Sequence, residues 1–207
     1  MKKKKDIENH KVMERVFKEI EIQDGKLLLM ENFIPQDKLD KYFNGLINNA
    51  DWNQEKVTVF GKKHLQPRLT AWYGDGKGYK HSGLEYEAKE WIDELKDIRK
   101  VLNHFLPGDK FNSVLLNQYR DGNDKVGWHS DDEKGMGTTP TIASVSLGAT
   151  RRFDLRHKET NEDIKMYLKS GSLLVMAGEL QNYWRHQIPV EKKVKDMRIN
   201  LTFRTII

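Results

Sequence analysis

The chain has 207 residues, which is enough for one domain with a sizeable core, and it contains no cysteine. The lack of cysteine excludes disulfides, thiolate metal sites and cysteine nucleophiles, and it suits a reducing compartment. The net charge of +5 favours anionic partners, while an aromatic content of 10% excludes a disordered chain despite 32% charged residues.

The N-terminus is basic, with a lysine run at residues 2–5. No apolar stretch follows the lysines as it would in a signal peptide, and no segment approaches membrane-spanning length. We therefore expect a soluble intracellular protein without a membrane partner, cytoplasmic or, in a eukaryotic source, nuclear. Residues 1–25 are expected to form a basic, partly mobile extension. A short amphipathic element in it is indicated by Val12, Val16, Phe17 and Ile20.

From Lys26 onwards the apolar pattern becomes regular. Residues 27–30 are apolar and strand-like, and Pro35 opens a helix. A second helix is predicted from about Ala88 to Phe105. Both have apolar residues at helical spacing, which we expect to face the core and buttress one face of a sheet. These residues are Leu39, Tyr42, Phe43, Leu46 and Ile47 in the first helix, and Trp91, Leu95, Ile98, Leu102 and Phe105 in the second.

The segment between the two helices, at about residues 56–86, is rich in aromatic residues, glycine and lysine. Aromatic rings interleaved with lysines suit stacking on bases while the lysines hold phosphates. An ordinary hairpin with a small core explains the same pattern. The residues alone leave both readings open.

After residues 107–108, Pro-Gly, the chain turns into short apolar strands separated by glycine-containing loops. Many short strands in a row predict a β-sandwich or jelly roll. The predicted strands are 113–119, 141–147, 152–156, 164–168, 173–176 and 198–205.

The sequence His129-Ser130-Asp131 has the spacing of a metal site. In an extended segment the first and third side chains project to the same face, so an imidazole and a carboxylate can meet one ion. His186 is the candidate for a second imidazole. Two His and one carboxylate leave three open positions, the arrangement of non-heme iron(II) oxygenases. Zinc that activates water is bound by the same ligand types, and a lone His-x-Asp also occurs by chance.

The C-terminal stretch from Arg198 to Arg204 alternates in polarity. As a strand it places Arg198, Asn200, Thr202 and Arg204 on one face and apolar residues on the other. An arginine inside a barrel requires an anion, and its fork matches a carboxylate. With an iron site, this predicts a dicarboxylate cosubstrate. The alternative is an edge strand with solvated arginines.

These motifs, with Asn117-x-Tyr119, resemble the AlkB family of 2-oxoglutarate- and iron(II)-dependent dioxygenases, most of all the animal-type branch that repairs duplex DNA. The resemblance implies an α+β, mostly β fold: a double-stranded β-helix (jelly roll) over residues 26–207, with buttressing helices and a nucleotide-recognition lid at about 56–86. It implies Fe(II), with 2-oxoglutarate and O2 as cosubstrates. The implied reaction is oxidative demethylation of N-alkylated DNA bases, such as 1-methyladenine and 3-methylcytosine.

The resemblance also assigns roles to single residues. It implies that His129, Asp131 and His186 bind the metal and that 2-oxoglutarate is bound by Asn117, Tyr119, Arg198, Asn200 and Arg204. A flipped base must leave the stack, and its gap would be filled by a wedge at Phe60. The base pocket would be lined by Tyr79 and His81, the base edge read by Glu133, and the DNA contacted by Arg68 and Arg156.

Two departures concern the substrate. His81 stands where the duplex-repair branch usually has Phe, and the connection after residue 158 is short and acidic, with Glu159, Glu162 and Asp163. Single-stranded DNA, duplex DNA and RNA therefore all remain candidate substrates of a protein that we expect to be a monomer. Three other classes compete: a hydroxylase of a protein or small molecule on this scaffold, a zinc hydrolase, and a silent nucleic-acid-binding module.

Overall fold

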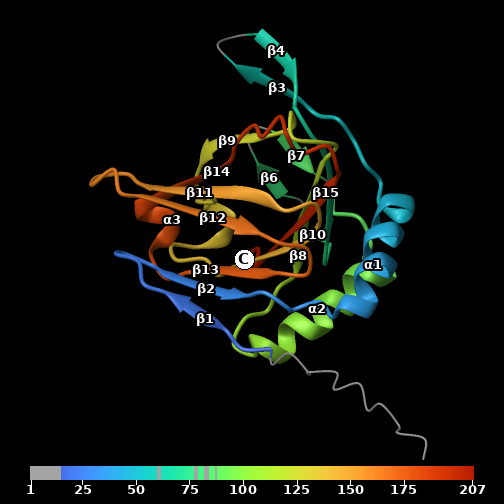
Figure 1. Ribbon diagram of the computed structural model, residues 1–207, viewed down its shortest axis with the longest axis horizontal. Helices are drawn as coiled ribbons and strands as arrows, with labels where there is room; N and C mark the ends of the chain where they lie inside the picture. The colour runs from blue at the N-terminus through green and yellow to red at the C-terminus, as the bar shows by residue number, and fades with distance from the viewer. Residues whose placement is uncertain (1–14, 60–61, 77–78, 82–83, 87) are drawn as a thin grey trace, which may run out of the picture.

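The structure, a computed structural model, describes residues 15–59, 62–76, 79–81, 84–86 and 88–207. Two antiparallel sheets face each other in a β-sandwich (Figure 1). The larger sheet has the order β1 (Lys18–Ile20), β2 (Lys26–Met30), β13 (Leu173–Ala177), β10 (Ile142–Gly148), β15 (Arg198–Arg204), β8 (Ser113–Tyr119) and β5 (Leu69–Gly74). The smaller sheet has the order β12 (Asp163–Leu168), β11 (Arg151–His157), β14 (Trp184–Ile188) and β9 (Val126–His129). The expected jelly-roll core is confirmed.

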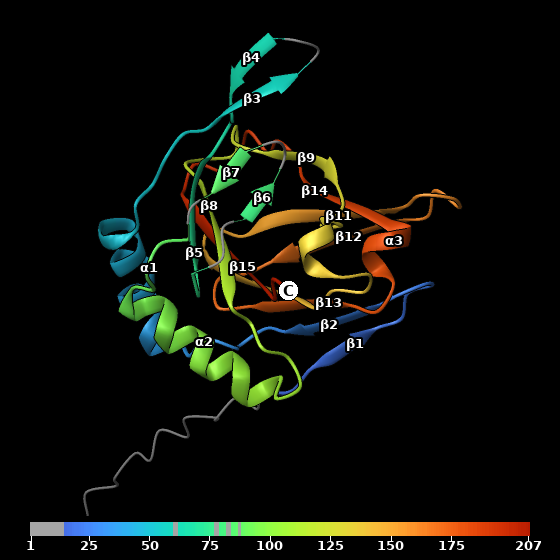
Figure 2. The ribbon, with the colours of Figure 1, turned by 180° about the vertical axis from the view of Figure 1, so that it is seen from behind.

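Two helices cover the outer face of the larger sheet, as expected from their apolar stripes. These are α1 (Gln36–Asn49) and α2 (Asp93–Phe105), seen together beside this sheet in Figure 2. Their buried leucines join the sheet residues in one core cluster. A second cluster fills the space between the sheets around Phe153, Leu174 and Trp184.

The predicted start of the second helix is wrong. Residues 88–92 are not helical, and α2 begins at Asp93. The backbone of Lys89 instead forms a bridge with Tyr73, and its carbonyl accepts a hydrogen bond from Gly74. Trp91 still reaches the core, because its ring stacks on Phe203 at 6.2 Å. Tertiary pairing to β5 therefore overrides the helical periodicity of this segment.

The strand β15 lies in the middle of the larger sheet, between β10 and β8. The alternative interpretation of Arg198 to Arg204 as an edge strand with solvated arginines is thus wrong, since every residue of β15 is buried. Ile199, Leu201 and Phe203 belong to the core under the helices. The alternating side chains, which include Arg198 and Arg204, line a pocket between the sheets.

The segment between the helices forms two hairpins, one before and one after β5 in the sequence. They are β3 (Lys56–Val59) with β4 (Lys62–Leu65) and β6 (Tyr79–His81) with β7 (Leu84–Tyr86). The first projects beyond the sandwich in both views (Figures 1 and 2). A short helix, α3 (Leu180–Tyr183), precedes β14, and a 3-10 turn covers Lys134–Met136. Among the described residues no helix is both long and apolar enough to cross a membrane.

Candidate active site

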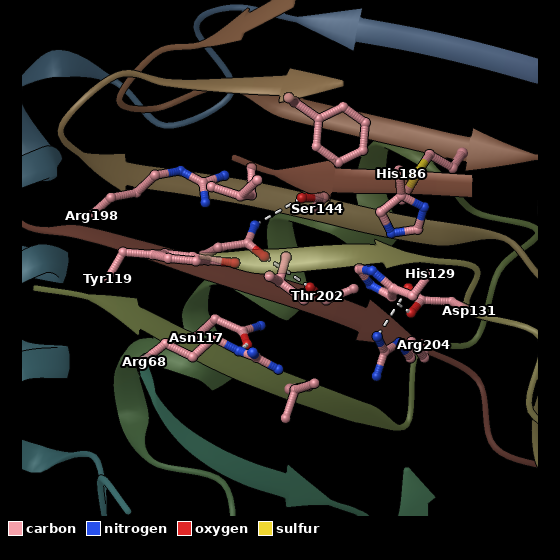
Figure 3. Close-up of a pocket in the computed structure, with 16 residues that line it drawn as sticks. Arg68, Asn117, Tyr119, His129, Asp131, Ser144, His186, Arg198, Thr202 and Arg204 are labelled. Atoms are coloured by element: carbon pink, nitrogen blue, oxygen red, sulfur yellow. Dashed lines mark hydrogen bonds and ion pairs between the residues drawn. The ribbon is translucent and has the colours of Figure 1, made fainter. Parts of the chain in front are cut away.

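The structure brings His129, Asp131 and His186 together at one end of the pocket (Figure 3). One candidate ligand atom from each lies within 4.8 Å of the others. His129 and His186 are register partners on the neighbouring strands β9 and β14, which sets their rings 4.3 Å apart. Asp131 follows two residues after His129, so it projects from the end of β9 toward the same point.

Each of the two imidazoles has an unprotonated ring nitrogen that can bind a metal. Nδ1 of His129 lies 2.8 Å from the Gly127 carbonyl oxygen, which fixes Nδ1 as the protonated nitrogen and directs Nε2 toward Asp131, 3.7 Å away. Burial, with a smaller effect of His129, lowers the pKa of His186 to about 3, so its ring is neutral at pH 7. The Phe153 ring stacks on His186 at 5.3 Å.

The carboxylate of Asp131 is held from several sides. It is 1% exposed and forms an ion pair with Arg204, whose Nη2 lies 2.9 Å from Oδ2. The backbone N–H of Asp131 donates to Oε1 of Gln181, at 2.8 Å, and the Ser130 hydroxyl donates to the Trp184 carbonyl, at 2.8 Å. The segment from α3 to β14 therefore supports both Asp131 and the second histidine.

The far end of the pocket is a hydrogen-bonded polar wall on the larger sheet. Asn200 lies opposite Asn117 in the register of β15 and β8, and Arg198 lies opposite Tyr119. Asn200 donates to the Ser144 hydroxyl at 2.8 Å and accepts from Thr202 at 3.0 Å. The two metal-facing histidines and this wall thus belong to different sheets, with the pocket between them.

Arg198 carries a buried charge that needs an anion. It is 1% exposed, and its Nη2 donates to Ser146 at 2.9 Å. Its Nε and Nη1 are buried and make no hydrogen bond within the described part of the chain. Burial lowers the pKa of Arg198 to about 10, partly offset by Tyr119, so the guanidinium remains charged at pH 7. A carboxylate that fills this end of the pocket would satisfy both orphaned donors.

The residues of the pocket therefore fit the iron(II) ion and the dicarboxylate cosubstrate that the sequence implies. Two neutral imidazoles and one carboxylate make a facial donor set for a divalent transition metal such as iron(II). The pocket joins this donor set to the charged, underbonded end of Arg198. A dicarboxylic acid can bind Arg198 with one end while its other end reaches the metal position.

The expected substrate residues occupy varied positions. Arg68 lines the pocket, is 6% exposed and donates through Nε to Oδ1 of Asn117 at 2.7 Å. Arg156 lies on β11 and forms an ion pair with Asp163. Glu133 is half-buried just before the 3-10 turn, outside the set of pocket-lining residues. Phe60 and the side chains of Tyr79 and His81 lie outside the described residues.

Sequence reasoning missed several residues of the site. Ser144 and Ser146 alternate with apolar residues within the predicted strand 141–147, so the same alternation argument used for β15 would have found them. Gln181 gave no signal, because it lies in a four-residue helix whose place beside Asp131 depends on the tertiary fold.

Comparison with known proteins defines the class. The model of the 2OG-Fe(II) oxygenase superfamily matches residues 26–204, which is most of the chain. The chain belongs to this superfamily of 2-oxoglutarate- and iron(II)-dependent dioxygenases and, within it, to the AlkB family.

The similar curated proteins are animal and plant AlkB relatives. The chain is 41% identical to the human DNA oxidative demethylase ALKBH2, with 88% of this chain and 70% of that protein aligned. It is 41% identical to the Bos taurus protein of the same name, of which it spans 66%, and 38% identical to the Bos taurus alpha-ketoglutarate-dependent dioxygenase alkB homolog 3. The solved structure of OsALKBH1 shares the fold, with a TM-score of 0.58 and 19% identity over 86% of this chain and 97% of that one.

Proposed function

We propose that the protein oxidatively removes alkyl groups from N-alkylated DNA bases, such as 1-methyladenine and 3-methylcytosine. The observation that carries this proposal is a single pocket with the His129, Asp131 and His186 donor set at one end and the underbonded Arg198 at the other. Similar proteins named DNA oxidative demethylases support the substrate class.

In this proposal His129, Asp131 and His186 hold iron(II). Arg198 binds the distal carboxylate of 2-oxoglutarate, helped by Asn117, Tyr119 and Asn200, and Arg204 orients Asp131 through their ion pair. Together, iron(II), 2-oxoglutarate and oxygen supply the oxidation that hydroxylates an N-methyl group, after which the carbon leaves as formaldehyde. The chain supplies the binding residues, the charge balance and a pocket lined by buried polar side chains.

We propose a role for Arg68 other than the DNA contact that the resemblance implies. Its guanidinium is buried beside Asn117 and donates to the Asn117 side chain. We assign it to orienting Asn117 toward the cosubstrate, while the hairpins β3–β4 and β6–β7 serve as the lid over the base. Phe60, Tyr79, His81 and Glu133 stay candidates for base contacts.

The proposal includes a monomer that acts inside the cell. The site needs no residue of a second copy, because the candidate ligands and the polar wall form one pocket within the chain. Light scattering coupled to size-exclusion chromatography would test this, and a dimer mass at low micromolar concentration would contradict it.

The decisive experiment loads the protein anaerobically with iron(II) and adds 2-oxoglutarate, oxygen and DNA that carries 1-methyladenine. Formaldehyde and succinate should appear together with loss of the methyl group, and an unmethylated strand is the control. Succinate without demethylation would reject methylated DNA as substrate and direct the search to RNA, proteins or small molecules. Neither product with verified iron loading would favour a zinc hydrolase or a silent binding module.

Matched single-stranded and duplex substrates test the strand preference. The connection between β11 and β12 is short, with Asp163 paired to Arg156, so it offers little basic surface to an opposite strand. We therefore infer a preference for single strands, which a higher rate on the duplex would contradict.

A further inference from the structure

A cationic cluster lies on the outer face of the smaller sheet, directly behind the two histidines. Trp128 precedes His129 on β9, and Arg185 precedes His186 on β14. Because neighbouring strand residues point to opposite faces, the histidines face the pocket while Trp128 and Arg185 face outward. Arg156 is the register partner of Arg185 on β11. The guanidinium carbons of Arg156 and Arg185 lie 5.0 and 5.7 Å from the Trp128 ring centroid.

We call Trp128, Arg156 and Arg185 the Trp128 cluster. Its two arginines differ in how their positive charges are neutralised. Arg156 is bound on its Nε and Nη2 by the carboxylate of Asp163, at 2.5 and 2.8 Å. The Nε of Arg185 is buried and has no hydrogen-bond partner among the described residues. The charge of Arg185 also acts on Asp163, more weakly than that of Arg156. Like charges directly opposite on neighbouring strands destabilise a sheet. Asp163 supplies one negative charge to two guanidiniums, so the cluster retains an excess positive charge, and the Nε of Arg185 remains an open donor.

The two guanidiniums and the aromatic ring of the cluster are suited to bind phosphate groups. Paired guanidiniums bind phosphate oxygens in a fork geometry, and aromatic rings beside cations suit a nucleic-acid strand. The same outer face carries Tyr167 on β12, 59% exposed, opposite Arg152 on β11. The strand β9 is the edge of the smaller sheet and ends at the donor set. A strand that inserts a base into the pocket can therefore run over this edge onto the outer face.

The resemblance already implies a DNA contact at Arg156. We propose that Trp128 and Arg185 extend this contact to a site for the sugar-phosphate backbone of the strand that carries the target base, and that Asp163 competes with this backbone for Arg156. The inference rests on the proposed function and adds a determinant of strand affinity to it. In the free protein Asp163 occupies Arg156 with both oxygens, and a phosphate must displace it or bind through Arg185 alone. Asp163 thus lowers affinity without any contact to the nucleic acid.

The test measures binding of a fluorescently labelled single strand, with and without 1-methyladenine, by anisotropy over a range of salt concentrations. Asp163→Asn should tighten binding about fivefold and steepen the dependence of log K on log salt by about one, because one more phosphate contact forms. Arg185→Gln should weaken binding and flatten the slope by about one. The control is Asp97→Asn on α2, which removes the same charge from the distant, exposed pair with Lys41.

A double variant tests whether Asp163 acts on nucleic-acid binding through Arg156. In Arg156→Gln, the Asp163→Asn change should lose most of its effect, since the guanidinium that Asp163 binds is gone and only Arg185 remains. Equal tightening by Asp163→Asn and Asp97→Asn, or an effect of Asp163→Asn that persists undiminished with Arg156→Gln, would overturn the proposal. Binding of polyglutamate that depends on Arg185 while oligonucleotide binding does not would assign the cluster to an acidic protein instead.

Formaldehyde release by the wild-type protein separates this inference from the proposed function. Turnover on the methylated strand, with binding unchanged in both Asp163→Asn and Arg185→Gln, would reject the cluster alone. Tightened binding in Asp163→Asn without turnover by any variant would reject the demethylase and retain the phosphate site. Thermal melting of each variant confirms that the fold is intact.

Discussion

At the scale of single residues, the pocket depends on a buried pair of opposite charges. Asp131 and Arg204 are both nearly inaccessible to solvent and lie 2.9 Å apart. Truncating one member of such a pair leaves the other charge buried and costs about 3–5 kcal/mol of stability. Asp131→Asn keeps the shape and a hydrogen-bonding oxygen, so it separates metal binding from folding better than alanine does.

We expect Asp131→Asn to weaken Mn(II) binding, followed by electron paramagnetic resonance, by more than about 100-fold, which is the upper end for loss of an outer partner alone. Turnover should fall with it, because a neutral amide is a poor ligand for the ion. Asp154→Asn is the matched control, since Asp154 is also buried and paired with an arginine, Arg152. Wild-type Mn(II) affinity in Asp131→Asn would remove this residue from the donor set.

Arg198 sets the requirement for the cosubstrate. Its two orphaned donors form charged hydrogen bonds only when a carboxylate is present, and such bonds contribute about 1.5–3 kcal/mol. Arg198→Gln should therefore raise the half-saturating concentration of 2-oxoglutarate about 10- to 100-fold. Arg152→Gln, on the outer face of the smaller sheet, should leave it unchanged. An unaltered requirement in Arg198→Gln would place the carboxylate elsewhere.

At the scale of secondary-structure elements, local pattern predicts the helices and the strands that are apolar or alternate without interruption, including the five-residue strands β2 and β13, and it fails for short strands with a polar residue at an inward position. The predicted strand 198–205 corresponds to β15 because seven residues alternate without interruption. In contrast, β9 and β14 have four and five residues, and in both a histidine that serves the pocket occupies an inward position where a strand pattern expects an apolar residue. The sequence therefore identified His129 and His186 as candidate ligands but did not predict the strands β9 and β14 that carry them.

The short helix α3 offers a test at this scale. It places Oε1 of Gln181 on the backbone N–H of Asp131, so it fixes the position of the carboxylate without contacting the metal position itself. We expect Gln181→Ala to lower Mn(II) affinity about tenfold, as loss of an outer-shell partner does. Asn182→Ala on the same helix is the control, because its side chain is exposed and donates only to the Thr138 carbonyl. Equal affinities in the two variants would show that α3 has no part in positioning Asp131.

At the scale of the whole molecule, the sequence alone predicts which residues form the site better than it predicts the residues that surround and support them. The donor set and the polar face of β15 could be predicted because alternation and charge burial are local arguments. The Arg204–Asp131 pair and the Trp128 cluster could not, since each joins residues far apart in the chain that meet only after the sheets pair. The start of α2 failed for the same reason, through its pairing with β5.

This division of the site between sheets has a thermodynamic consequence. The histidines belong to the smaller sheet and Arg198 to the larger one, so a metal alone binds side chains of the smaller sheet and of the segment after β9, while the distal carboxylate of 2-oxoglutarate binds the larger sheet. Together they connect the two sheets through the pocket, and each ligand should raise the affinity for the other by the same factor. Mn(II) at 100 times its dissociation constant stabilises the fold by about 2.7 kcal/mol, or about 5–10 °C in melting temperature.

We therefore expect Mn(II) and 2-oxoglutarate together to raise the melting temperature by more than the sum of their separate shifts in differential scanning calorimetry. In Arg198→Gln the excess should vanish while the shift by Mn(II) alone remains, because that variant breaks the link only on the larger sheet. In Asp131→Asn both should be lost. Additive shifts in the wild-type protein would show that the two ligands bind independently, and that the pocket does not join the sheets through them.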